Sequence, residues 1–71
     1  MAYFTVHLDH ETSEHAGAGG TFQVFSITGE NGEDHTHLVD QGKHYHNLAG
    51  LASDIAVALG VPAKDVHLEE V

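Results

Sequence analysis

The chain has 71 residues, which suits one domain close to the size at which a single hydrophobic core is marginal. It contains 11 Asp and Glu, 2 Lys and no Arg, and its formal net charge is −9. This charge repels nucleic-acid phosphates and anionic membranes, and the absence of cysteine excludes disulfides, thiolate metal sites and cysteine nucleophiles.

The hydropathy pattern indicates where such a chain would reside. No stretch approaches the ~20 apolar residues of a membrane span, and the first residues lack the basic region of a signal peptide. We therefore expect a cytoplasmic protein that contacts neither membranes nor nucleic acid directly.

Residues 3–8 alternate between apolar and polar side chains, which is typical of a half-buried strand. Residues 9–20 are acidic and end in a glycine-rich run, so we expect a flexible loop there. The whole chain, residues 1–71, is expected to form a single α+β domain.

Two tight-turn signals, Asn31-Gly32 and Gln41-Gly42, divide residues 21–46 into three segments. Asn-Gly between alternating runs favours a hairpin; Gln41-Gly42 is a weaker signal, in which we expect Gly42 to take the positive φ that such a turn needs. Two-residue turns at both places would give a three-stranded antiparallel meander, whose side chains alternate between two faces. The first face would carry Phe25, Ile27, Leu38 and Tyr45. The second would carry Val24, Ser26, Thr28, Val39, His35, His37, His44 and His46.

A helix is expected next, over residues 48–59. Asn47 is a favourable N-cap, and the apolar residues that follow recur with helical periodicity. Gly60 and Pro62 are typical of a helix end. The apolar stripe of this helix should cover the first face of the meander. Residues 66–71 then read as a short last strand beside the first strand, with Val66 and Leu68 facing inward.

The other side of the expected helix is small and almost uncharged. Small side chains permit close approach by another element, so we expect a two-fold homodimer through this side. The alternative is a helix whose outer side is simply solvated. The predicted interface residues are Ala49, Ser53, Ala56 and Val57.

The histidines of the second face suggest a metal site. Direct partners on paired strands have Cβ atoms about 5 Å apart, and imidazole suits Zn²⁺, Ni²⁺ and Cu²⁺. A protein that binds one of these metals through a subset of His35, His37, His44 and His46 is therefore one interpretation. The alternative is a solvated surface, because no carboxylate is placed as an obvious fourth ligand. Histidine also changes charge near neutral pH, so the eight histidines allow a pH-dependent net charge.

Signals for catalysis are weak. The expected meander places Ser26 opposite His37, but no nucleophile elbow or oxyanion hole accompanies the pair. Little chain is left to build a pocket, so we expect no enzymatic activity.

Dense negative charge is the most distinctive property of the chain. It favours a small acidic protein-binding module, an inhibitor or regulator that occupies a basic surface of a partner. The combination of size and charge resembles that of phage-borne inhibitors that mimic nucleic acid. The alternative is that the charge serves solubility alone. The predicted contacts are Glu30, Glu33, Asp34, Glu69 and Glu70.

Overall fold

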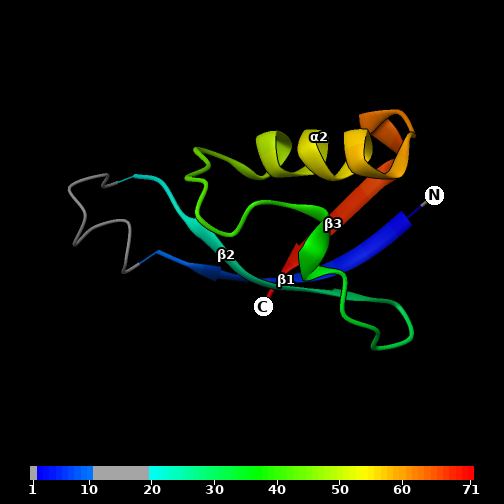
Figure 1. The fold of residues 1–71 in the computed structure, drawn as a ribbon, viewed down its shortest axis with the longest axis horizontal. Helices are drawn as coiled ribbons and strands as arrows, with labels where there is room; N and C mark the ends of the chain where they lie inside the picture. The colour runs from blue at the N-terminus through cyan, green and yellow to red at the C-terminus, as the bar shows by residue number, and fades with distance from the viewer. Residues whose placement is uncertain (1, 11–19) are drawn as a thin grey trace.

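The computed structural model describes residues 2–10 and 20–71. Three strands form one sheet, in the order β2-β1-β3. A helix packs on one face of the sheet, as Figure 1 shows. The elements are β1 (Ala2–Asp9), β2 (Gln23–Gly29), the 3-10 turn η1 (Thr36–Leu38), α2 (Leu48–Leu59), the 3-10 turn η2 (Ala63–Asp65) and β3 (Val66–Glu70). The predicted α+β class is confirmed. Of the predicted loop at 9–20, residue 9 ends β1, and residues 11–19 lie outside the described residues.

β1 is the central strand, antiparallel to β2 and parallel to β3. The parallel pair joins the two ends of the chain, with Ala2 beside Val66 and Val6 beside Glu70. Parallel neighbours need a crossover, and α2 lies within the connection that supplies it. The predicted neighbourhood of the first and last strands is confirmed, whereas the sheet is mixed rather than purely antiparallel.

A β-bulge in β2 decides which of its side chains reach the core. The pairing with β1 shifts between His7 and Leu8, which leaves Phe25 as an extra, unpaired residue. The extra residue reverses the alternation, so Val24 and Ile27 are both buried although they are three positions apart. Phe25 is 68% exposed. The prediction that Phe25 is buried and Val24 lies on the other face is wrong, because it assumed regular alternation through this point.

The predicted hairpin at Asn31-Gly32 has a longer turn than expected. The backbone N–H of Gly29 donates to the carbonyl of Glu33 at 2.8 Å, so three residues rather than two lie between them. The extra residue shifts the register by one position, and Thr28 pairs with Asp34 instead of His35.

Asp34 and Thr36 then end the pairing with β2. The carboxylate of Asp34 accepts hydrogen bonds from the backbone N–H of Thr36 at 3.1 Å and from its hydroxyl. The same hydroxyl oxygen accepts from the backbone N–H of Ile27 at 3.1 Å, so a side chain stands where a strand partner was expected. Residues 36–38 consequently form η1, and the predicted second and third strands of the meander reduce to isolated bridges.

The core lies between the sheet and α2. Ile27 and Tyr45 are buried as predicted, Leu38 is half-buried against the core, and Val66 and Leu68 face inward. The buried apolar side chains are Phe4, Val6, Phe22, Val24, Ile27, Tyr45, Leu51, Ile55, Ala56 and Val66.

The helix begins and ends at the predicted residues. The side chain of Asn47 accepts a hydrogen bond from the backbone N–H of Gly50 at 2.8 Å. Gly60 has φ of 73°, in the left-handed region that favours glycine at a helix end. Capping residues thus set the position of the element that covers one face of the sheet.

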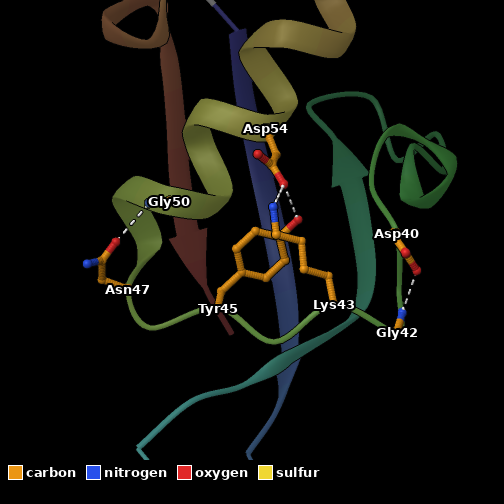
Figure 2. A network of polar contacts seen from close by, with 7 residues as sticks. All are labelled: Asp40, Gly42, Lys43, Tyr45, Asn47, Gly50 and Asp54. Carbon is orange, nitrogen blue, oxygen red and sulfur yellow. Dashed lines mark hydrogen bonds and ion pairs between the residues drawn. The ribbon is translucent and has the colours of Figure 1, made fainter.

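A polar network joins the segment before α2 to the helix (Figure 2). The Tyr45 hydroxyl and the Lys43 ammonium each donate to Oδ2 of Asp54 at 2.7 Å, and the ammonium lies 5.1 Å from the centre of the Tyr45 ring. Hydrogen bonds from Lys43 and then from Tyr45 lower the pKa of Asp54. Burial, followed by the hydrogen bond to Asp54, raises the pKa of Tyr45.

A turn at Gln41-Gly42 is present just before this network, but Gly42 does not adopt the predicted positive φ. The backbone N–H of Lys43 donates to the carbonyl of Asp40 at 3.1 Å, and the Asp40 carboxylate accepts from Gly42 at 2.9 Å. The turn does not join two strands of the sheet. Instead, Tyr45 exchanges backbone hydrogen bonds with Phe22, just ahead of β2.

Among residues 2–10 and 20–71, no helix combines the length and apolar character needed to span a membrane.

Candidate functional site

The face of the sheet opposite α2 carries mostly polar side chains. Strand register places Tyr3 beside His67, and Thr5 between Thr28 and Glu69. Because strand side chains alternate, these residues point away from the core formed by their neighbours. We call this surface the open face; its members are Tyr3, Thr5, His7, Ser26, Thr28, His67 and Glu69.

A hollow of about 490 Å³ opens on the open face. Glu30 borders it from the turn after β2, and Glu69 borders it from β3. These two residues come from distant parts of the sequence and border the same hollow from the two sides of β1. The lining residues are Tyr3, Phe4, Thr5, Glu30, His67, Leu68 and Glu69.

Two rings lie side by side in this hollow. The centroids of Tyr3 and His67 are 4.8 Å apart, with an interplanar angle of 19°. Tyr3 is 50% exposed. The Nε2 atom of His67 is buried and has no hydrogen-bond partner in the described part of the chain. Such unpaired buried atoms are uncommon in folded proteins.

The five predicted partner contacts are all exposed, but they have different local roles. Glu33 lies 3.5 Å from Nε2 of His35, where it lines a second hollow of about 290 Å³. Asp34 holds the start of η1, and the hydrogen bonds from Thr36 lower the pKa of its carboxyl group.

The two C-terminal contacts lie on different sides of the sheet. Glu70 pairs with Val6, a core residue, and its carboxylate lies 3.0 Å from Nε2 of His10. Glu69 pairs with Thr5 on the open face. The structure therefore brings Glu30 and Glu69 together at one hollow and leaves the other predicted contacts outside it.

The four predicted metal ligands do not share a strand face, because the segments that contain them do not pair as strands. His35 and His37 lie together, with ring centroids 6.1 Å apart. His44 instead contacts the hydroxyl of Thr21, with Nδ1 and Oγ1 3.3 Å apart, and His46 is exposed. The described ranges contain no group of three His, Asp or Glu residues that could hold a metal ion.

Three of the four residues predicted to form a dimer surface on α2 are exposed. Ala49, Ser53 and Val57 are exposed, and Val57 is 82% exposed. Ala56 is 2% exposed and belongs to the core, so its assignment to the outer side is wrong. The buried residues of the helix are Leu51, Ile55 and Ala56.

The predicted contact between Ser26 and His37 is not formed. Ser26 lies opposite His7 across β1 and β2, and its Oγ atom is 3.2 Å from Nδ1 of His7. The change of partner follows from the turn and bulge that replaced the regular meander.

Sequence reasoning did not select Tyr3, Thr5 and His67 as site residues. The sequence pattern did indicate that these side chains face outward, because apolar and polar residues alternate in both residues 3–8 and residues 66–71. Combining that alternation with the pairing of the two strands would have placed Tyr3 and His67 on one face.

Comparison of the chain with models of protein families, with curated proteins and with solved structures finds no match. Function is therefore inferred from the charge, surface and geometry of the chain itself.

Proposed function

We propose that this protein is a small acidic binding module that occupies a basic surface of a partner protein, as an inhibitor or regulator. The observation that carries the proposal is the imbalance of charge, with 11 acidic residues against 2 lysines. One of the two lysines, Lys43, already forms an ion pair with Asp54 of the same chain, so it is not available to offset the other carboxylates.

A surface of this kind favours a cationic partner on physical grounds. Like charges on one small domain repel each other, and a basic surface relieves that repulsion when it binds. Complementary charge also accelerates encounter between the two proteins. Glu30, Glu33, Asp34, Glu69 and Glu70 support this reading, because all five are exposed at the surface.

The proposal is tested with a labelled oligo-arginine peptide as a stand-in for the basic partner. Binding is expected at low salt and should weaken steeply with added salt, because the Debye length falls from about 10 Å at 0.1 M to about 3 Å at 1 M. Absence of binding at low salt would contradict the proposal, as would comparable binding to duplex DNA.

A matched pair of variants separates a defined surface from net charge alone. Each variant replaces four carboxylates by amides and therefore carries the same net charge. The first is expected to lose most of the binding and the second little; equal losses would favour the solubility alternative. The first changes Glu30, Glu33, Glu69 and Glu70 to Gln, and the second changes Asp40 and Asp65 to Asn and Glu11 and Glu14 to Gln.

A further inference from the structure

We infer that the hollow on the open face is an arginine-binding site, in which Glu30 and Glu69 receive the guanidinium of a basic partner beside the Tyr3 and His67 rings. This inference rests on the proposed function and adds to it the contact residues and the residue type that the partner supplies.

The first support is the free state of the two carboxylates. Within residues 2–10 and 20–71, no hydrogen bond or ion pair engages the side-chain carboxylate of Glu30 or of Glu69. Other acidic residues are occupied, since Glu33 contacts His35 and Glu70 contacts His10. The two carboxylates at the hollow therefore keep their full capacity to accept hydrogen bonds from a ligand.

The second support is the aromatic lining. The rings of Tyr3 and His67 are nearly parallel, and Tyr3 remains half exposed. The strand order puts Glu30 on the opposite side of Tyr3 from His67. A guanidinium stacks on aromatic faces and donates two parallel hydrogen bonds to a carboxylate, whereas an ammonium acts as a point charge. The combination of ring and carboxylate thus favours arginine over lysine.

The third support is an unpaired ring nitrogen of His67, one of the residues that line the hollow. Nε2 of His67 is buried without a hydrogen-bond partner in the described residues. Because His67 lines the hollow, a donor that enters the hollow can pair with this atom once the ring turns to expose it. A guanidinium has five N–H donors, enough to bond both carboxylates and still offer a donor to the ring.

The size and charge of the hollow fit the same occupant. Its volume of about 490 Å³ exceeds what one side chain needs, so neighbouring residues of the partner can enter with the arginine. The net charge of −9 supplies the long-range attraction for a cationic segment.

The test measures affinity for oligo-arginine and oligo-lysine peptides of equal length, using the full chain. The hollow variant, Glu30→Gln with Glu69→Gln, is compared with a control variant, Asp40→Asn with Asp65→Asn. Both variants remove two charges. Neither Asp40 nor Asp65 lines the hollow, and Asn at position 40 still accepts the Gly42 hydrogen bond.

The hollow variant is expected to lose about tenfold or more in affinity for oligo-arginine, and the control less than about threefold. Wild type should prefer oligo-arginine to oligo-lysine, and the hollow variant should lose that preference. Tyr3→Leu, which keeps the charge, should also reduce the preference. Circular dichroism and thermal unfolding establish that each variant is folded before its affinity is compared.

Two results would overturn the arginine site. Equal losses of affinity in the two double variants would show that net charge, and not the two carboxylates at the hollow, determines binding. Equal affinity of wild type for both peptides would show that the Tyr3 and His67 rings do not select arginine. Either result leaves salt-dependent binding by wild type, and with it the proposed function, in place. Wild type that binds neither peptide at low salt would overturn both.

Discussion

The two faces of the sheet are built from the same three strands, but one is buried under α2 and the other is exposed. Under α2, Val6 and Ile27 have no exposed surface and share one core with Leu51. On the open face, Tyr3 is half exposed, and the side-chain carboxylate of Glu69 has no hydrogen-bond or ion-pair partner among the described residues. One face therefore stabilises the fold, and the other carries the proposed binding site. Substitutions on the two faces should separate stability from binding.

The largest expected effect contrasts two adjacent helix residues. Ala56→Glu places a charge in the core and should destabilise the domain by on the order of 5 kcal/mol, enough to unfold it. Val57→Glu, at an exposed position, should change the free energy of unfolding by about 0.5 kcal/mol or less. Chemical denaturation followed by circular dichroism measures both, and a folded Ala56→Glu protein would contradict the placement of this helix.

Val57→Glu also tests the predicted homodimer, because it changes the outer side of α2 without disturbing the core. If wild type sediments as a dimer, this variant should sediment as a monomer. Wild type that is monomeric at high micromolar concentration would show that the small outer side of the helix is solvated.

A second contrast lies within β2. Ile27→Ala removes a fully buried side chain and should cost about 2–5 kcal/mol in unfolding free energy. Phe25→Ala, at the bulge, should cost far less despite removing more atoms, because most of the Phe25 ring is exposed. Urea unfolding curves give both values, and a larger loss for Phe25→Ala would mean that the bulge is misplaced.

An intermediate effect on the free energy of unfolding is expected for the hydrogen bond that attaches the segment before α2 to the helix. Tyr45→Phe removes the hydroxyl that donates to Asp54 and should cost about 1–2 kcal/mol. The lower part of this range applies because the Asp54 carboxylate is partly open to solvent. A double change with Asp54→Asn should cost less than the sum of the single changes, since the two residues share one network.

The pH dependence of this network follows from its pKa shifts. The pKa of Asp54 is lowered by folding, so its contribution is present above the ordinary value of 3.8 and is lost as pH falls further. The pKa of Tyr45 is raised, so its contribution is present below 10.0 and is lost as pH rises above that value. The stability difference between wild type and Tyr45→Phe should thus be constant near neutral pH and shrink at both extremes. A difference that grew above pH 10 would contradict the hydrogen bond.

The smallest effects concern two glycines of the helix that covers the buried face. Gly60→Ala forces a side chain into left-handed backbone and should destabilise by about 1–2 kcal/mol. Gly50→Ala should stabilise by about 0.5–1 kcal/mol, because a Cβ there meets its nearest neighbour at an ordinary 3.5 Å. Thermal unfolding distinguishes the two, and effects of the same sign would contradict the cap assignment.

Much of the buried face was predictable from the sequence, because local signals define its elements. Asn47 and Gly60 fix the ends of α2, and alternation identifies β1 and the inward side of β3. The meander was not predictable in the same way. The third residue in the turn and the unpaired Phe25 each move the side chains that follow to the other face of the sheet. Neither extra residue can be recognised from an alternating sequence pattern.

The candidate site was predicted only in part for a related reason. Exposed Glu30 and Glu69 could be selected from charge alone, but their convergence depends on β1 lying between β2 and β3. The four histidines do not form the predicted cluster, because that prediction depended on the strand register of a regular meander. Tyr3 and His67 were recognisable as outward residues, and only their strand pairing makes them neighbours.

The most direct test of the division between the two faces is a nuclear magnetic resonance titration of the full chain with an oligo-arginine peptide. Amide resonances of Tyr3, Thr5, His67 and Glu69 are expected to shift progressively as peptide is added, while those of Ser53 and Val57 on the outer side of α2 stay in place. Shifts concentrated on α2, with the open face unchanged, would contradict the account.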